Sequence, residues 1–357
     1  METRNDPVRG APDSFPPPGP RHGTLTYRGV NYDVGTRIGG YLSRAHWDPL
    51  AVRNDMRAIR RQLHCDSVII YGTDLERLFE GATIALETGL HVWLEPRLHD
   101  AEPAHTLEHL AETARAADGL RELHSDVYLI LGSALSVHAS GILSGDDIAE
   151  RVATLEGERG QEELPVANAR LNRLLNKALT IARSDFYGKI TYAAGLWENV
   201  DWRGFDIIGL NYYRTGPQPA NVSADLRPCQ RRGLPVVITE FGCPSYRGAE
   251  EHSPDLDEAV DRSYPVPQLR TEHTRDEQVQ ADHITELLQL FRSERLAGAF
   301  VFEFLAPNHP HSADPRYDLD MVSYSLVRSL PEGTGRGAPR WEPKAAFNEV
   351  AQIYRDA

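Results

Sequence analysis

Eight short apolar runs alternate with segments of helical periodicity along this chain, and this alternation restricts the possible folds more than any other feature of the sequence. The runs are LTYRGVN (25–31), CDSVIIYG (65–72), LHVWLEPR (90–97), DVYLILGS (126–133), KITYAAG (189–195), FDIIGLNYY (205–213), LPVVITEFG (234–242) and LAGAFVFEF (296–304). Their middles are continuously apolar, which is typical of parallel strands covered by helices on both faces. The sequence therefore predicts an α/β protein with a parallel sheet.

The segments between these runs show helix signals. Asp48 and Pro49 offer an N-cap and a first-turn proline, and Val52, Met56 and Ile59 then recur at helical spacing. No GxGxxG or Walker sequence follows a run, which disfavours a nucleotide-binding doubly wound sheet. We predict a single-domain (β/α)8 barrel over residues 24–357, with all eight strands parallel and the first paired with the eighth.

Two segments fall outside this pattern. Residues 1–23 are rich in Pro, Gly and charge and lack the apolar core of a signal peptide, so we expect a disordered arm. The stretch 243–274 is long and irregular and directly follows the seventh run. Loops of this length are either functional or mobile, and on a barrel this one would lie over the C-terminal face.

Composition restricts the class of ligand and the cellular compartment that we expect for this protein. The formal net charge of −14 argues against a nucleic-acid ligand, which needs Lys and Arg to neutralise phosphates. No stretch approaches the length of a membrane span. Three cysteines cannot all pair, and together with the missing signal they favour the cytoplasm. We expect a neutral or cationic small molecule as ligand; the oligomeric state stays open.

Polar residues gather where the predicted strands end, and strand ends of a barrel converge on one pocket. Glu240 stands out because it ends the apolar run VVIT, where burial and neighbouring charges can tune a carboxyl group. Asn and Tyr side chains such as Asn31, Tyr32, Asn211 and Tyr213 give neutral hydrogen bonds and aromatic faces that suit a sugar. Packing within the barrel is an equally weighted interpretation of the tyrosines.

The segment LPVVITEFG resembles the seventh strand of the clan A glycoside hydrolases, the cellulase-like retaining glycosidases. GVNYD, FDIIGLNYYR, YDLDMVSYSLV and RWEPKAAF extend the resemblance over most of the chain after residue 25. The last two segments are more similar to uncharacterised actinobacterial barrel proteins labelled abortive infection proteins. The resemblance implies a (β/α)8 hydrolase of a small glycoside or glycosylated natural product, with Glu240 as nucleophile.

Retaining glycosidases need a second carboxyl group as acid and base, and in clan A it ends strand four. Here Ser133 and Ala134 occupy the positions of the Asn-Glu pair, so the resemblance implies that Ala134 marks a missing acid/base and that its Cβ faces Glu240. A natural loss, a changed reaction and a deliberate substitution all remain open. This form would then be inactive or impaired.

Two residues could replace the missing acid. Glu303 is the better candidate, although a structural carboxylate paired with Arg97 or Arg316 is an equal alternative. His138 is more often an ordinary loop histidine. In NHPHSADPRYDLD, a proline-broken surface loop is favoured over a metal site because no ligand spacing supports a metal. The predicted substrate contacts are Asn31, Tyr32, Tyr71, Glu95, Arg97, Ser133, His138, Trp197, Asn211, Tyr213 and His309.

Three functions fit these residues. The leading hypothesis is a retaining glycosidase-like hydrolase without metal or cofactor. A second is a carbohydrate- or metabolite-binding pseudoenzyme that kept the pocket. A third is a barrel enzyme of altered chemistry, such as an isomerase, lyase or cyclase, with Glu240 or Glu303 as general base, since barrels support many chemistries.

Overall fold

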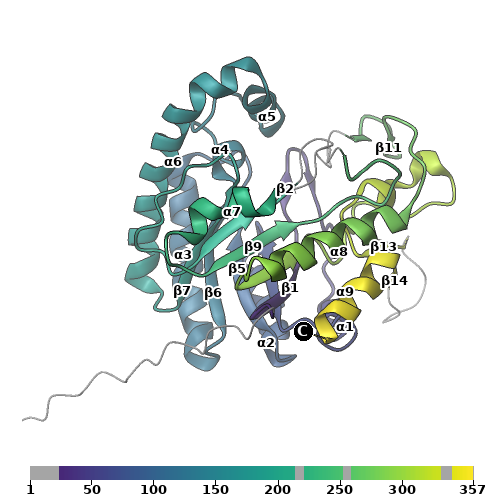
Figure 1. Cartoon of the computed structure of the whole chain (residues 1–357), viewed down its shortest axis with the longest axis horizontal. Helices are drawn as coiled ribbons and strands as arrows, with labels where there is room; N and C mark the ends of the chain where they lie inside the picture. Colours follow the sequence, from purple (N-terminus) through teal and green to yellow (C-terminus); the bar gives the residue numbers. More distant parts are fainter. Residues whose placement is uncertain (1–23, 214–220, 252–258, 331–339, 357) are drawn as a thin grey trace, which may run out of the picture.

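The computed structural model describes residues 24–213, 221–251, 259–330 and 340–356, and its centre is a closed barrel of eight parallel strands (Figure 1). The barrel strands are β1 (Tyr27–Asp33), β4 (Ser67–Gly72), β5 (His91–Pro96), β6 (Val127–Ser133), β7 (Lys189–Gly195), β8 (Ile208–Asn211), β9 (Val236–Phe241) and β12 (Gly298–Val301). They follow one another around the barrel in chain order, and β12 closes the ring on β1. The predicted (β/α)8 barrel is confirmed. The predicted arm, residues 1–23, lies outside the described residues.

Helices surround the barrel, most of them along its outside. They are α1 (Pro49–Arg61), α2 (Leu75–Glu87), α3 (Pro103–Leu123), α4 (Leu135–His138), α5 (Ile148–Glu156), α6 (Glu158–Asp185), α7 (Val222–Gln230), α8 (Glu277–Ser293) and α9 (Ala345–Arg355). In Figure 1, α3 and α6 lie on one side of the strands and α8 and α9 on the other. Asp48 caps α1 by accepting a hydrogen bond from the Leu50 amide at 3.0 Å, and Pro49 follows at N1, as predicted. Residues 196–207, between β7 and β8, form no helix.

Large side chains fill the interior of the barrel. Trp93 stacks on Tyr128 with 4.5 Å between ring centroids, and Phe300 meets the Trp93 ring edge-on at 5.2 Å. Gly29 of β1 faces this cluster, and a Cβ there would lie 2.2 Å from the Phe300 ring. The glycine is therefore required by close packing, and the barrel is a filled core rather than a pore.

Short additional elements lie in the loops. They are three antiparallel pairs, β2 (Arg37–Ile38) with β3 (Tyr41–Leu42), β10 (Val260–Asp261) with β11 (Gln268–Leu269), and β13 (Val327–Ser329) with β14 (Trp341–Pro343), and the 3₁₀ turns η1 (Pro315–Tyr317) and η2 (Leu319–Val322). The β10–β11 pair corrects the prediction that 243–274 is irregular throughout. Val260 and Leu269 bury apolar surface against Leu319 and Met321, which holds this loop to the one after β12. Residues 252–258 lie outside the described part.

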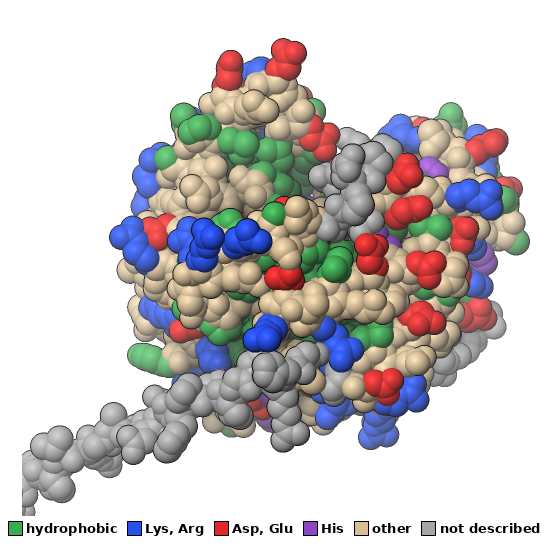
Figure 2. Space-filling view, in the orientation of Figure 1, with side chains coloured by type: hydrophobic (Ala, Val, Ile, Leu, Met, Phe, Trp, Pro, Cys, Tyr) green, Lys and Arg blue, Asp and Glu red, His purple; other side chains and the backbone are tan. Residues whose placement is uncertain are grey.

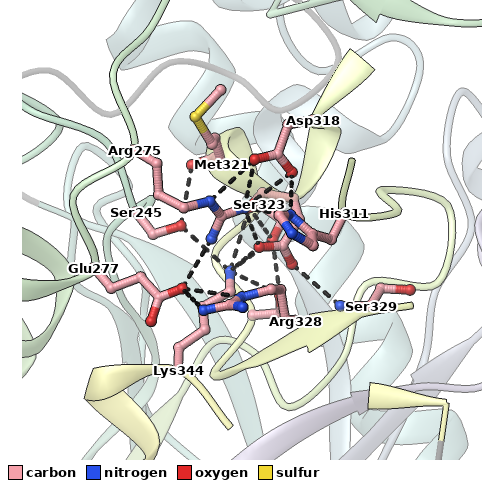
Figure 3. A network of polar contacts seen from close by, with 12 residues as sticks. Ser245, Arg275, Glu277, His311, Asp318, Met321, Ser323, Arg328, Ser329 and Lys344 are labelled. Atoms are coloured by element: carbon pink, nitrogen blue, oxygen red, sulfur yellow. Dashed lines mark hydrogen bonds and ion pairs between the residues drawn. The ribbon is translucent and has the colours of Figure 1, made fainter. Parts of the chain in front are cut away.

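A buried ionic network joins the two loops (Figure 3). Lys344 Nζ lies 3.0 Å from Asp320 Oδ2, and neither side chain is exposed. Arg275 Nη2 is 2.8 Å from both Asp318 Oδ2 and Asp320 Oδ2. Asp318 and Asp320 are buried because these cations compensate their charges, so the prediction of a surface loop is wrong for this part of NHPHSADPRYDLD.

Two further properties concern possible partners of the described part of the chain. No three His, Cys, Asp or Glu side chains within the described ranges come together as a group that could hold a metal ion. None of the helices there combines the length and the apolar character needed to cross a bilayer.

Candidate active site

Arg97 connects the polar side chains at the ends of the barrel strands. It directly follows β5 and is buried. Its Nε donates to Glu95 Oε1 at 2.6 Å, and its Nη2 donates to Glu240 Oε1 at 2.5 Å. The guanidinium carbon lies 4.1 Å from the centre of the Tyr71 ring, a cation–π contact. One cation thus holds two carboxylates that are far apart in the sequence.

Neutral donors complete the surroundings of Glu240. Tyr213 Oη donates to Glu240 Oε2 at 3.2 Å, and Ser133 Oγ lies 3.4 Å from Oε1. Asn211 Nδ2 donates to the same Ser133 oxygen at 2.8 Å, while Thr239 Oγ1 donates to Asn211 Oδ1 at 2.8 Å. This chain of hydrogen bonds fixes the orientation of the carboxylate.

Register irregularities of the sheet bring these side chains together. The pairing of β8 with β9 shifts between Leu210 and Asn211, so that Asn211 stands opposite Glu240. The pairing of β6 with β7 also shifts, between Ile130 and Ser133. Such irregularities re-aim side chains at the rims of barrels. The polar cluster therefore depends on the local register at the strand ends as well as on residue type.

The charges at Arg97 do not balance when both of its partners are ionised. Burial is the largest effect on Glu95 and raises the pKa of its carboxyl group to about 7. The Arg97 cation opposes this rise, and the charge of Glu240 adds to it. Two carboxyl groups that share one guanidinium in a buried site favour retention of a proton by one of them. The cluster can therefore store a proton near neutral pH.

Glu303 is a separate buried carboxyl group that follows β12. Tyr71 Oη donates to its Oε2 at 2.6 Å. Burial raises the pKa of Glu303 to about 8, and the negative charge of Asp33 adds to this effect, while the hydrogen bond from Tyr71 opposes it. At neutral pH Glu303 is therefore mostly protonated. Neither arginine of the alternative interpretation binds it: Arg97 holds Glu95 and Glu240, and Arg316 lies over the Tyr317 ring.

A cavity of about 550 Å³ opens at the C-terminal ends of the strands. Its described walls are Asp33, Thr36, Ile38, Gly39, Tyr41, Ser43, Tyr71, Arg97, His99, Asp100, His138, Asp147, Ile148, Ala149, Arg270, Phe302, Glu303, Asn308 and His309. Glu303 is in this wall, whereas Glu240, which the sequence predicts to line the same pocket, is absent from its described part, so that prediction is wrong for Glu240. The Glu240 carboxylate is connected to the cavity through Arg97. Arg270 follows β11, so the loop after β9 contributes to the cavity.

Three histidines in the cavity wall are neutral. The rings of His99 and His138 stack with 4.7 Å between centroids, and His138 Nδ1 lies 2.8 Å from the Ser133 carbonyl oxygen. Burial lowers the pKa of His138 to about 4 and that of His309 to about 3. Burial also lowers the pKa of His99, with His138 adding to the effect. Neutral imidazoles can accept or donate one hydrogen bond per ring nitrogen, which suits hydroxyl-bearing ligands.

Comparisons with known proteins concern the fold of this chain. No family model matches the sequence, and no curated protein does. Among solved structures, the chain is similar to a GH113 β-1,4-mannanase with a TM-score of 0.60 and 14% identity, over 94% of this chain and 100% of the mannanase. It is similar to a GH113 β-mannanase from Alicyclobacillus acidocaldarius with a TM-score of 0.57 and 16% identity, over 94% and 99% of the two chains. It is also similar to a family 1 β-glucosidase from Thermotoga maritima with a TM-score of 0.55 and 12% identity, over 95% of this chain and 98% of the glucosidase.

The chain shares its fold with these glycosidases. At such low identities the similarity establishes the fold alone, and activity is a separate question. The predicted resemblance to clan A glycosidases is supported at the level of the fold. The finer resemblance to abortive infection proteins stays a prediction.

Ser133 and Ala134 differ in what their side chains contact. Ser133 ends β6 and is the member of the pair that contacts Glu240. Ala134 adopts a left-handed conformation, with φ 40° and ψ 48°, precedes α4, and packs in the main apolar core. The contact with Glu240 is that of Ser133, and the prediction that the Ala134 Cβ faces Glu240 stays a prediction.

Three other predicted substrate contacts lie away from the cavity. Tyr32 is fully buried and donates to Asp55 Oδ2 of α1 at 2.7 Å, so it is a core residue rather than a substrate contact. Asn31 is also fully buried and donates to the Thr239 carbonyl at 2.9 Å. Trp197 is 38% exposed, donates to Ser136 Oγ at 2.9 Å and is absent from the described cavity wall.

The remaining predicted residues line the cavity or belong to the cluster around Glu240. Tyr71, Arg97, His138, Glu303 and His309 line it, and Glu95, Ser133, Asn211, Tyr213 and Glu240 form the cluster connected to it through Arg97. The predicted substrate contacts omitted His99, Asp100 and Arg270. His99 and Asp100 follow Arg97 in the same strand-end loop, a position that could have identified them. Arg270 has no comparable sequence signal.

Proposed function

We propose that this protein is a glycosidase-type hydrolase of a small glycoside, with Glu303 as proton donor and Glu240 as nucleophile. The observation that carries the proposal is the Glu303 carboxyl group, which lies in the cavity wall and is mostly protonated at neutral pH because burial raises its pKa to about 8. A general acid needs this protonation state and this access. The cavity volume of about 550 Å³ falls within the range of roughly 300–1,000 Å³ typical of small-molecule sites.

The proposed reaction has two steps. In the first, the Glu303 proton passes to the glycosidic oxygen as its bond to the anomeric carbon breaks, and a Glu240 oxygen bonds to that carbon. In the second, ionised Glu303 takes a proton from water, the water oxygen bonds to the anomeric carbon, and the bond to Glu240 breaks. Both carboxyl groups return to their starting states, and the product keeps its anomeric configuration.

Arg97 imposes a condition on this reaction. Its guanidinium donates to Glu240 at 2.5 Å and itself lines the cavity, so it lies between the carboxylate and the ligand space. Attack on a sugar therefore requires Arg97 to shift when substrate binds. Glu95, which also binds Arg97 at 2.6 Å, offers a site to which the guanidinium can withdraw. Glu95 then serves as a positioning residue.

The test is hydrolysis of a panel of methyl and 4-nitrophenyl α- and β-glycosides, including mannosides and glucosides, with product anomers followed by NMR. We expect hydrolysis with retention by the wild type and losses of about 10²- to 10⁴-fold in Glu303→Gln on the methyl glycosides. The loss should be smaller on the 4-nitrophenyl glycosides, because their leaving group needs little protonation. Glu240→Gln should abolish turnover of every glycoside. Inversion of configuration, or full activity of either variant, would refute these roles.

A second candidate is a sugar-binding protein without turnover. It is favoured by the hydrogen bonds that Glu240 accepts from Arg97, Tyr213 and Ser133, because they occupy the carboxylate oxygens that would have to attack the sugar. It predicts saturable binding of sugars to the wild type, the same affinity in Glu240→Gln, and no product after prolonged incubation. Calorimetric titration beside the hydrolysis assay distinguishes the two functions.

A further inference from the structure

The hairpin after β1 presents an apolar surface to the cavity. Ile38 and Tyr41 stand directly opposite each other in the β2–β3 pair, joined by Gly39 and Gly40, with Gly39 at φ 50°. Residues directly opposite in an antiparallel pair project from the same face of the ribbon, so these two side chains form one patch. Both line the cavity, and neither is fully buried.

A second apolar surface comes from α5. Asp147 caps this helix by accepting from the Glu150 amide at 2.9 Å, and Ile148 is its first residue. Ile148 and Ala149 line the same cavity as the hairpin, although about 110 residues separate the two segments. In Figure 1, α5 projects at the same end of the molecule as β2, and Figure 2 shows hydrophobic side chains in the hollow below it.

Arg151 fixes the position of this helix. It is fully buried, and its Nε donates to the Val137 carbonyl at 2.6 Å and its Nη1 to the Gly145 carbonyl at 3.1 Å. Its Nη2 binds Asp100, which is itself part of the cavity wall. Ile148 lies one turn before Arg151 on the same helix face, so this anchoring holds Ile148 at the cavity.

The cavity is therefore chemically divided. Its inner part, at the strand ends, carries the polar groups of Asp33, Arg97 and Glu303. Farther from the barrel, the hairpin and α5 supply the apolar groups, beside the charged side chains of Asp147 and Arg270. A sugar without an aglycone would leave the apolar part of the cavity exposed to water. A ligand that covers this apolar part removes its surface from water, which favours binding. We propose that the substrate is a glycoside with a hydrophobic aglycone, which lies against Ile38, Tyr41 and Ile148 while the sugar occupies the polar part. This inference rests on the proposed function.

The test compares ligands that differ only in the aglycone. The probes are methyl and 2-naphthyl β-D-mannoside, the corresponding β-D-glucosides, and free 2-naphthol, titrated calorimetrically into the full chain carrying Glu240→Gln, which prevents turnover during the titration; all further variants are made in this background. We expect the naphthyl glycoside of the accepted sugar to bind at least about tenfold more tightly than the methyl glycoside. Ile148→Asp and Ile38→Thr should reduce this preference several-fold while leaving the affinity for the methyl glycoside unchanged.

The variants are chosen to keep the fold. Aspartate is favourable in the first turn of a helix, and threonine keeps the β-branched shape that suits a strand. Val166→Asp is the matched control, because Val166 is 54% exposed on α6 and is absent from the described cavity wall. It should leave every affinity unchanged.

The outcomes separate this inference from the proposed function. Equal affinities for naphthyl and methyl glycosides would overturn the apolar aglycone site and leave the hydrolase proposal standing. Binding of free naphthol that depends on Ile148, without binding of any glycoside, would support the apolar site and overturn the hydrolase proposal for β-D-mannosides and β-D-glucosides. Absence of binding by all five probes would overturn the apolar site, because free naphthol alone should bind there, and would leave the hydrolase proposal to the glycoside panel.

Discussion

Replacing Glu303 with glutamine should remove a pH dependence from the stability of the fold. Burial raises the pKa of this carboxyl group from 4.5 to about 8, so the folded protein binds the Glu303 proton more tightly than the unfolded chain does. The stability that comes from this proton is complete below pH 4.5 and is lost as the pH rises toward 8. Glutamine has the same shape, can accept the hydrogen bond from Tyr71 and does not titrate.

The expected magnitude follows from the interval between the two pKa values. Each pH unit within it corresponds to 1.36 kcal/mol, so the whole interval from 4.5 to about 8 is worth about 5 kcal/mol as an order of magnitude. Between pH 5 and pH 9, the free energy of unfolding of the wild type should therefore fall by about 4 kcal/mol relative to that of Glu303→Gln.

The assay is urea unfolding followed by circular dichroism at pH values from 5 to 9, with both proteins measured side by side. Taking the difference between the proteins cancels the titration of all groups that they share. Glu349→Gln, the same substitution at an exposed position of α9, is the control and should change the free energy of unfolding by no more than about 0.5 kcal/mol. A wild-type minus Glu303→Gln difference that stays constant within about 1 kcal/mol would refute the assignment of Glu303 as a buried, protonated acid.

The same contacts make further predictions. In the proposed reaction the protonated form of Glu303 is active, so kcat/KM should fall as the pH rises through about 8. In pH–rate profiles, Tyr71→Phe should move this fall to higher pH, because the Tyr71 hydrogen bond lowers the pKa of Glu303. Asp33→Asn should move it to lower pH, because the Asp33 charge raises that pKa. Shifts in the same direction for both variants would contradict these two predictions. Arg97→Met should lower the free energy of unfolding at pH 8 by about 3–5 kcal/mol, because two buried carboxylates lose their shared cation. The loss should be smaller at pH 5, and an equal loss at both pH values in urea titrations would contradict this prediction. Lys344→Met should lower the same quantity at pH 7 by about 3 kcal/mol, because a fully buried ion pair is broken; an unchanged urea midpoint would show that the network in Figure 3 contributes little.

Much of the site was predictable because barrel topology brings strand ends together. Glu240, Glu95 and Arg97 follow or end apolar runs, and they meet in one cluster although Arg97 and Glu240 are 143 positions apart. Their partner choice was less predictable. The sequence offered Arg97 as a partner for Glu303, whereas the structure pairs it with Glu95 and Glu240 and leaves Glu303 to Tyr71. Such choices depend on distances of a few ångströms between elements.

The direction of side chains was also beyond the sequence. In a run that is apolar on both faces, alternation does not show which residues face the barrel axis, and Tyr32 proved to face α1. The register of β6 shifts near Ser133, and Ala134 takes a left-handed conformation, at the point where Ser133 contacts Glu240. Residue types do not indicate such a register shift, and alanine seldom adopts a positive φ, so neither feature could be predicted from the sequence.

The sequence by itself determined the eight strands, their parallel order and the capped start of α1, because these depend on local periodicity and on capping within a few residues. Only the tertiary structure decided that Glu303 lies in the cavity wall while Glu240 is held by Arg97, and that Asp320 and Lys344 are buried together. The physical reason is that burial and charge pairing set the state of an ionisable group, and both arise from residues that are distant in the chain and adjacent only after the barrel closes.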